Sequence, residues 1–211
     1  MTHLTLVRHG QTDWNLQGLC QGQLDIPLNA AGLAEVEQAG LRLKDERFDA
    51  FYSSDLSRAI QTAEAVNRYQ HMTIVPDARL RELYFGEWEG QPFATLKAQR
   101  PSMLDYWLFD PLVPPGGETT EEFARRSRVF LDEILERHRG QRVVITAHGG
   151  SLKMLVLLTL RMPIETRWQL RMGNAAISRL QYYAEGGVLL SYNDTTHLDA
   201  LRRTSEALKI D

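Results

Sequence analysis

Near the N-terminus a short apolar run, Leu4-Thr5-Leu6-Val7, leads directly into Arg8, His9 and Gly10. A strand that is apolar on both faces is typical of the centre of a parallel sheet, where helices cover both sides. Ligands of open α/β sheets bind just beyond the carboxyl ends of the strands. Arg8 and His9 stand at such an end, and Gly10 would let the backbone come close to a ligand. The run therefore predicts an α/β fold with a ligand site at His9.

The rest of the chain alternates between helical and extended patterns, as such a sheet requires. We expect further strands over 48–53, 73–75 and 142–146, a hairpin formed by 176–183 and 188–192, and helices over 30–44, 58–67, 118–138 and 151–160, with a marginal helix after His197. In the helix over 30–44 the residues Leu33, Val36 and Leu43 should face inward, and in the long helix Val129 and Phe130 should do so.

Two segments break this alternation. Residues 11–29 are rich in Gln, Gly, Asn and Asp, which predicts a long loop. Residues 81–117 are dense in aromatic residues, Pro and Gly, and we expect them to form a small excursion over the carboxyl edge of the sheet. Base rates indicate that its aromatic side chains mostly pack in the core or the cap, among them Tyr84, Trp88, Tyr106 and Trp107. The whole chain, 1–211, is expected to form one domain.

Composition narrows the class of protein. The formal net charge of -3 gives no basic field of the kind that binds nucleic acid or acidic membranes. Cys20 is the only cysteine, so no disulfide forms within the chain, which fits a reducing compartment. No signal peptide pattern is present at the N-terminus, and the most apolar segment, 154–160, is too short to span a bilayer. We expect a cytoplasmic protein with neither nucleic acid nor membrane as a partner.

The second half of the chain repeats the pattern of the first, because Val143-Val144-Ile145 leads through Thr146 and Ala147 into His148 and Gly149. A lone histidine at a strand end is more often structural than catalytic. Two such units in one α/β chain raise the odds of a catalytic role, because both histidines then lie along one sheet edge. A metal site is disfavoured, since zinc needs at least three ligands and the neighbours of these histidines are arginine and glycine.

Two further residues follow strands that should end on the same side. Arg58 opens a helix directly after a strand, so its guanidinium and the helix N-terminus could face one anion, although a solvated first-turn arginine is the simpler interpretation. Glu82 begins the aromatic excursion and is a candidate general acid.

Together these residues predict phosphoryl transfer through a histidine. Neutral His9 would attack phosphorus, while Arg8, Arg58 and His148 hold the phosphoryl oxygens and Glu82 protonates the leaving oxygen. The neighbouring arginines should lower the pKa of His9 and keep it unprotonated near neutral pH. Water would then hydrolyse the phosphohistidine with Glu82 as base. The scheme needs no metal and no organic cofactor.

At this point the sequence resembles the histidine phosphatase superfamily, the phosphoglycerate mutase-like proteins. Matching blocks occur in the family's order from about Leu4 to His197: Leu6-Val7-Arg8-His9-Gly10-Gln11-Thr12-Asp13-Trp14-Asn15, Gly22-Gln23-Leu24-Asp25-Ile26-Pro27-Leu28, and the blocks at 53–63, 81–90, 115–119 and 146–150. The resemblance implies a three-layer α/β/α sandwich with a mostly parallel central sheet and a small helical cap. It implies His9 as the phosphorylated nucleophile, Glu82 as acid and base, and a phosphate pocket formed by Arg8, Arg58 and His148.

The resemblance also implies further substrate contacts. It makes Asn15 a hydrogen-bond donor to phosphate, adds backbone groups near Gly149, and places Gln21 and Gly22 in a loop that borders the substrate. Glu118 is either another pocket residue or an acid in the first turn of the following helix.

Within the superfamily the short excursion and the ending Tyr192-Asn193-Asp194-Thr195-Thr196-His197-Leu198 resemble the phosphatase branch that includes α-ribazole 5'-phosphate phosphatase and broad-specificity phosphomonoesterases. A phosphatase acting on a small phosphomonoester is the leading hypothesis. The alternatives are a cofactor-dependent phosphoglycerate mutase and an inactive binding protein on the same fold. A homodimer formed through the hairpin edge is a further possibility that the sequence leaves open.

Overall fold

The computed structural model describes residues 1–99 and 113–207, and its centre is one sheet with the strand order β3-β2-β4-β1-β5-β6. The strands β1 (Thr2–Arg8), β2 (Ala50–Ser53), β3 (Ile74–Pro76) and β4 (Arg142–Ala147) are parallel, whereas β5 (Ile177–Tyr183) and β6 (Gly186–Asp194) add an antiparallel hairpin. The sheet is therefore mostly parallel, as the sequence predicts. Arg8 lies opposite Ala147 in the register of β1 and β4, so the two His-Gly strand ends are neighbours.

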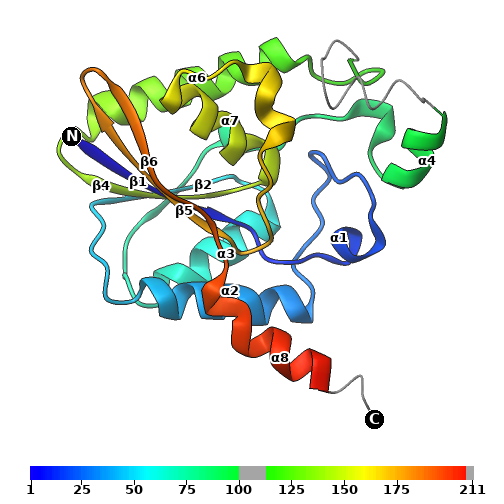
Figure 1. Cartoon of the computed structure of the whole chain (residues 1–211), viewed down its shortest axis with the longest axis horizontal. Coiled ribbons are helices and arrows are strands. Elements are labelled where there is room, and N and C mark those ends of the chain that lie inside the picture. The colour runs from blue at the N-terminus through cyan, green and yellow to red at the C-terminus, as the bar shows by residue number, and fades with distance from the viewer. Residues whose placement is uncertain (100–112, 208–211) are drawn as a thin grey trace.

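Helices cover both faces of the sheet (Figure 1). The helices α6 (Thr120–Arg137) and α7 (Gly149–Leu160) lie on one face, and α2 (Ala30–Leu43) and α3 (Ser57–Asn67) lie on the other. Strand β4 shows why both layers form: Val143 and Ile145 pack into the first core, and Val144 packs into the second. The predicted three-layer α/β/α sandwich is confirmed.

Two expected inward side chains are exposed. Val129 is 53% exposed, because consecutive residues of a helix point about 100° apart and its neighbour Phe130 occupies the core. Leu33 is 50% exposed, because the first turn of α2 packs Gly32 against the loop at Gln11, where a Cβ on Gly32 would lie 2.0 Å from the Gln11 carbonyl oxygen. The hydrophobic pattern alone did not distinguish these positions from the truly buried stripe.

The expected loop over 11–29 contains a short helix, α1 (Asp13–Gln17). Thr12 caps it by accepting a hydrogen bond from the Asn15 amide, and the Asn15 side chain accepts one from the Thr12 amide. This helix is too short for a hydrophobic period to reveal it. The same loop also caps α3, because Asp25 Oδ1 accepts a 2.7 Å hydrogen bond from the Ser57 amide.

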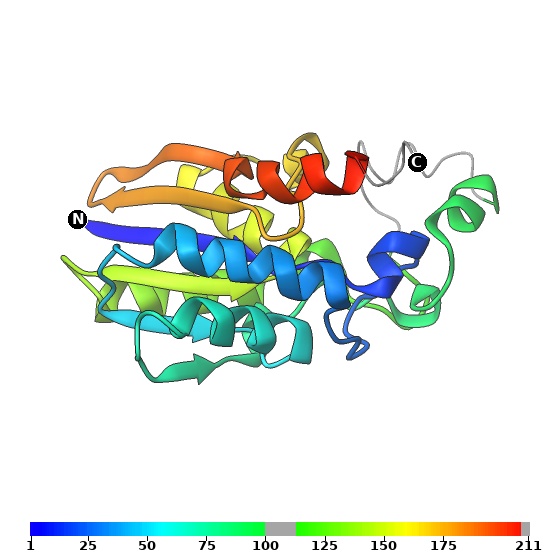
Figure 2. The ribbon, with the colours of Figure 1, turned by 90° about the horizontal axis from the view of Figure 1, so that it is seen from below.

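The excursion from 81 lies beyond the carboxyl edge of the sheet, beside α1 (Figures 1 and 2). Trp88 is buried in a small cluster with Cys20 and Leu96, whereas Tyr84 is 42% exposed. Tyr106 and Trp107 lie outside the described residues. The remaining elements are α4 (Phe93–Gln99), α8 (Asp199–Ala207) and the short 3-10 helices at Ala78–Leu80, Gly86–Trp88, Ile164–Gln169 and Thr196–Leu198. In the described ranges, no helix combines the length and the apolarity needed to cross a membrane.

Candidate active site

The two strand-end histidines meet, as the sequence predicts. The ring centroids of His9 and His148 are 5.2 Å apart. His9 is 3% exposed and lines a cavity at the carboxyl edge of the sheet, whereas His148 is fully buried and is not among the residues that line it. Neighbouring parallel strands in register explain the proximity, but the two rings have different surroundings.

His9 is held in one tautomer. Its Nδ1 lies 2.7 Å from the Gly10 carbonyl oxygen, which can only accept, so Nδ1 carries the proton and Nε2 keeps a free lone pair. Burial lowers the pKa of His9 well below its usual value, and the charges of Arg8 and Arg58 lower it further. The arginine effect predicted from the sequence is present, although burial is the larger cause. Neutral His9 can therefore act as a nucleophile through Nε2.

Gly10 has a different reason to be glycine than the one expected. A Cβ at Gly10 would lie 2.5 Å from the Gly32 carbonyl oxygen and 2.8 Å from Val36 Cγ1, both in α2. Gly10 does not line the cavity. The close backbone approach is thus to the first turns of α2 and not to a ligand, which corrects the sequence interpretation.

Arg58 lines the cavity and is almost completely buried, so the solvated first-turn arginine is excluded. Its Nε donates to His148 Nδ1 at 3.1 Å, and its Nη1 and Nη2 donate to the carbonyl oxygens of Leu24 and Gly22 at 2.7 and 2.8 Å. Burial lowers the pKa of Arg58 to about 10, which leaves it charged at neutral pH. A guanidinium has five N–H donors, so two remain for a ligand.

Arg8 is the second guanidinium of the cavity. Its Nη1 donates to the Met172 carbonyl oxygen at 2.6 Å, and its buried Nε has no hydrogen-bond partner within the described part of the chain. An orphaned buried donor is uncommon in a folded protein and marks a place where a ligand can complete the bonding. Two partly unused guanidiniums beside His9 make this cavity suitable for an oxyanion.

Both ring nitrogens of His148 are engaged inside the protein. Nδ1 accepts from Arg58 Nε, so the neutral ring carries its proton on Nε2, 2.8 Å from Ser54 Oγ. Burial lowers the pKa of His148 well below its usual value, and Arg58 and His9 lower it further. In this geometry His148 fixes the orientation of Arg58. Its direct contact with a phosphoryl group stays a prediction.

Glu82 lines the cavity with a fixed carboxylate. Oε1 accepts from the Leu83 amide at 2.9 Å, and Oε2 accepts from the Gly150 amide at 2.8 Å. A Cβ on Gly150 would lie 2.0 Å from Glu82 Oε1, so the first turn of α7 needs glycine for this approach. The two amide bonds keep the carboxylate at the cavity wall, where a general acid and base must stand.

The remaining residues predicted to contact the substrate divide into those that line the cavity and one that does not. Asn15, Gln21 and Gly149 line the cavity. Gly22 does not line it, and acts on the site through its carbonyl bond to Arg58. Their roles toward a substrate stay predictions.

The remaining cavity wall is largely apolar, with two further cations. It is lined by Leu19, Leu83, Phe85, Phe93, Phe123, Gly150, Met172, Lys153 and Arg167. Among the described residues no group of three or more His, Cys, Asp or Glu could hold a metal ion.

The family model of the histidine phosphatase superfamily (branch 1) matches residues 4–195. The chain belongs to this superfamily. A protein of Hydrogenobacter thermophilus named "Putative phosphoserine phosphatase 2" is 34% identical over 199 residues, 93% of this chain and 98% of that protein. A protein of Proteus mirabilis named "Probable phosphoglycerate mutase GpmB" is 35% identical over 207 residues, 94% of this chain and 95% of that protein. A mycobacterial glucosyl-3-phosphoglycerate phosphatase structure is 32% identical with a TM-score of 0.84, covering 90% of this chain and 98% of that one.

Membership of the histidine phosphatase superfamily confirms the resemblance drawn from the sequence blocks.

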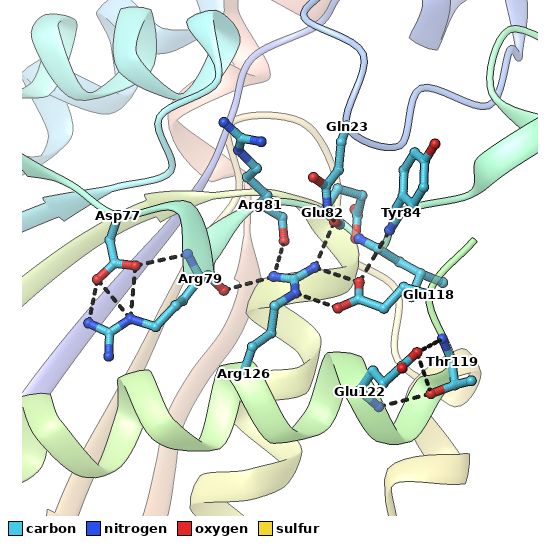
Figure 3. A network of polar contacts seen from close by, with 11 residues as sticks. Gln23, Asp77, Arg79, Arg81, Glu82, Tyr84, Glu118, Thr119, Glu122 and Arg126 are labelled. Carbon is cyan, nitrogen blue, oxygen red and sulfur yellow. Dashed lines mark hydrogen bonds and ion pairs between the residues drawn. The ribbon is translucent and has the colours of Figure 1, made fainter. Parts of the chain in front are cut away.

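One residue that supports the site was not predicted from the sequence. Arg126 donates to the carbonyl oxygens of Arg79, Arg81 and Glu82 at 2.7–2.8 Å (Figure 3). It thereby holds the segment that carries Glu82. Arg126 lies mid-helix among other arginines, so no sequence signal set it apart.

Glu118 is neither a pocket residue nor an acid of the first helical turn, so both expectations made for it are wrong. Its carboxylate forms an ion pair with Arg126, 2.7 Å between Oε1 and Nε, and it does not line the cavity (Figure 3). It also precedes Thr119, the N-cap of α6, so the acids of the first turn are Glu121 and Glu122. Glu118 therefore supports the Glu82 segment through Arg126.

Proposed function

We propose that this protein hydrolyses small phosphate monoesters through a phosphohistidine at His9, without a metal or an organic cofactor. The observation that carries this proposal is the lone pair of His9 Nε2, kept unprotonated in a cavity beside two guanidiniums with unused donors. A phosphate group is the ligand that satisfies both features, because it offers an electrophilic phosphorus and oxygens for bidentate arginine contacts.

The reaction proceeds in two steps. His9 Nε2 attacks phosphorus, the bond from phosphorus to the ester oxygen breaks, and Glu82 gives that oxygen its proton. Water then attacks the phosphohistidine, Glu82 takes the proton of the water, and phosphate leaves as His9 is restored. Arg8 and Arg58 bind the phosphoryl oxygens throughout, and the Gly10 carbonyl retains the proton on Nδ1.

Several candidate substrates are compatible with this mechanism. The resemblance of the sequence ending favours α-ribazole 5'-phosphate, whereas the relatives carry names that favour phosphoserine and phosphorylated glycerates. The single cysteine, Cys20, supports placing the reaction in the cytoplasm.

A phosphoglycerate mutase is the second candidate, because relatives at about the same identity carry that name. A mutase returns the phosphoryl group from His9 to a substrate hydroxyl and excludes water, whereas a phosphatase admits water. The two activities differ in their products and in dependence on a bisphosphorylated primer.

The test measures phosphate release from a panel of phosphomonoesters in the presence of a metal chelator, with conversion of 3-phosphoglycerate to 2-phosphoglycerate followed in parallel. Release that survives the chelator, with a phosphohistidine trapped by acid-free quenching and located at His9 by mass spectrometry, supports the proposal. Isomerisation without release supports the mutase. Absence of both reactions and of the phosphoenzyme would contradict the proposal and favour an inactive binding protein.

A further inference from the structure

A tight turn precedes β5, and the proposed hydrolysis uses neither of its central residues. The Ala176 amide donates to the Gly173 carbonyl oxygen at 3.3 Å, so Asn174 and Ala175 are the two central residues of the turn. Ala175 has a φ of 52°, a left-handed conformation that favours glycine. A strained residue persists only where its surroundings hold it, and such residues cluster at functional sites. The contacts of this turn therefore indicate what it does.

The turn is bonded to the end of β1 that carries the nucleophile. The Ala175 amide donates to the His9 carbonyl oxygen at 3.1 Å. The side-chain amide nitrogen of Asn174, Nδ2, lies 3.3 Å from the same oxygen and 3.2 Å from the Gly10 carbonyl oxygen. That second oxygen is the acceptor that keeps the proton on His9 Nδ1, and its two lone pairs allow it to accept from both groups. Asn174 thus fixes the acceptor that decides the tautomer of His9.

Asn174 also contacts the side chain that is predicted to donate to phosphate. Its Nδ2 lies 3.1 Å from Asn15 Oδ1, and the amide and the hydroxyl of Thr12 donate to the same oxygen, each at 3.1 Å. Three donors on Oδ1 settle which way the amide of Asn15 is turned. Its Nδ2 group is thereby left for a ligand of the cavity that Asn15 lines.

The C-terminal block at 192–198, which resembles the phosphatase branch, holds the turn from its other side. Asn193 Oδ1 accepts from the Gly173 amide at 2.7 Å, and His197 Nε2 lies 3.1 Å from the Ala175 carbonyl oxygen. A carbonyl oxygen only accepts, so Nε2 of His197 carries the proton. The turn is bonded both to this block and to the end of β1, which explains how the strained conformation of Ala175 is maintained.

We propose that Asn174 is a positioning residue, which aligns the nucleophile His9 and the phosphate donor Asn15 for the same phosphoryl transfer. It acts on His9 through the Gly10 carbonyl oxygen, and it acts on Asn15 through Oδ1. Asn174 does not line the cavity, so it has no direct contact with the reacting atoms. This inference rests on the proposed phosphatase function and adds a residue to its machinery.

Removal of the Asn174 amide tests the proposal on the phosphomonoester that the wild type hydrolyses fastest. N174A should lower kcat/KM by about 10- to 100-fold, because small displacements of a nucleophile and of a phosphate donor are costly in the transition state. N174L, which keeps the branched shape without a donor, should show a similar loss. An unchanged kcat/KM in both variants would overturn the proposal.

The matched control is N67A. Asn67 is also half-buried and also bonds backbone through its side-chain amide, donating to the Met72 carbonyl oxygen and accepting from the Met72 amide, both at 2.8 Å. It lies at the last residue of α3 and does not line the cavity. We expect N67A to keep kcat/KM within about twofold of the wild type, even where its stability falls. Equal losses of kcat/KM in N67A and N174A would overturn the proposal.

The tautomer of His9 distinguishes positioning from a purely structural role. In protein that contains ¹⁵N-labelled histidine, the chemical shifts of the ring nitrogens show which one carries the proton, and the signals of His9 are those that H9Q lacks. We expect the proton on Nδ1 in the wild type and in N67A, and a mixture of both tautomers in N174A and N174L, because the Gly10 carbonyl is then free to turn. A ring that keeps its proton wholly on Nδ1 in both Asn174 variants would overturn the action through Gly10.

Binding of inorganic phosphate separates this proposal from the proposed function, because it requires no turnover. Calorimetry should give N174A a Kd about tenfold higher than that of the wild type, the effect of one displaced hydrogen bond to a charged ligand, and should give N67A an unchanged Kd. A changed tautomer and Kd in N174A, without hydrolysis by the wild type, would contradict hydrolysis and keep the positioning role. Hydrolysis through a phosphohistidine, with tautomer, Kd and rate unchanged in N174A, would do the reverse.

Discussion

The ends of β1 and β4 carry the same motif, an apolar strand followed by His-Gly, yet they produce different environments. His9 faces the cavity with a free Nε2, whereas His148 has both ring nitrogens bonded to other side chains. The difference comes from the flanking segments. His9 is followed by a loop, but His148 is the N-cap of α7 and is bonded to Ser54 and to Arg58, which lies in the first turn of α3.

The comparison teaches that position at a strand end brings a histidine to the site, and its hydrogen-bond partners decide what it can do there. Burial lowers the pKa of both rings, so both are neutral at physiological pH. Neutrality is therefore not what separates a nucleophile from a supporting residue. The separation lies in whether a nitrogen lone pair faces the cavity.

The sharpest test of the comparison is His9→Gln. We expect kcat/KM for phosphate release to fall by about 10⁴-fold or more, since the only free imidazole lone pair that lines the described cavity is lost. Steady-state rates and mass spectrometry of the quenched enzyme check this. A phosphoenzyme that still forms would show that another residue is the nucleophile.

His148→Gln should have a smaller effect. Replacing the rigid imidazole acceptor of Arg58 Nε by a flexible amide should lower kcat/KM by about 10²- to 10³-fold, the usual loss for a charge-stabilising contact, while His9 is still phosphorylated. His138→Gln, which removes a histidine bonded to Tyr52 away from the cavity, is the control. Loss of phosphoenzyme equal to that of His9→Gln would remove the distinction between the two histidines.

Ser54→Ala tests the tautomer of His148. The variant leaves the Nε2 proton of His148 buried without its acceptor, so we expect about a tenfold fall in kcat/KM and a loss of about 1–3 kcal/mol in the free energy of unfolding. Ser53→Ala is the matched control, because Ser53 Oγ donates to the Ser54 carbonyl oxygen and not to the histidine. Similar rates for both variants would contradict the assigned role of Ser54.

The smallest expected effect is on the pH dependence of stability, and both histidines contribute to it. Each has a folded pKa well below the unfolded value of about 6.5, so the unfolded state binds more protons as pH falls and the protein loses stability. Between pH 7.5 and 5.5 each ring should account for roughly 1.4 kcal/mol of that loss. Urea unfolding at both pH values should show a shallower pH dependence in His9→Gln and in His148→Gln; an unchanged dependence would mean that the rings titrate in the folded state.

Much of this architecture follows from the sequence alone. Apolar runs such as Val143-Val144-Ile145 are buried whatever their partners, and the ends of parallel strands meet at one edge, so the fold class and the meeting of His9 with His148 could be predicted. The ordered blocks also sufficed to identify the superfamily. These features depend on local patterns and on rules of topology that hold for any α/β sheet.

Tertiary structure decided which atoms face the cavity. No local pattern could show that Arg126 holds the segment of Glu82, that Gly10 makes room for α2, or that Lys153 stands in the cavity wall. Each of these depends on contacts between residues far apart in the chain, and those contacts arise only when the layers pack. The sequence determined the fold and brought the reactive residues to one edge; packing determined the tautomers, the unused donors and the balance of charge.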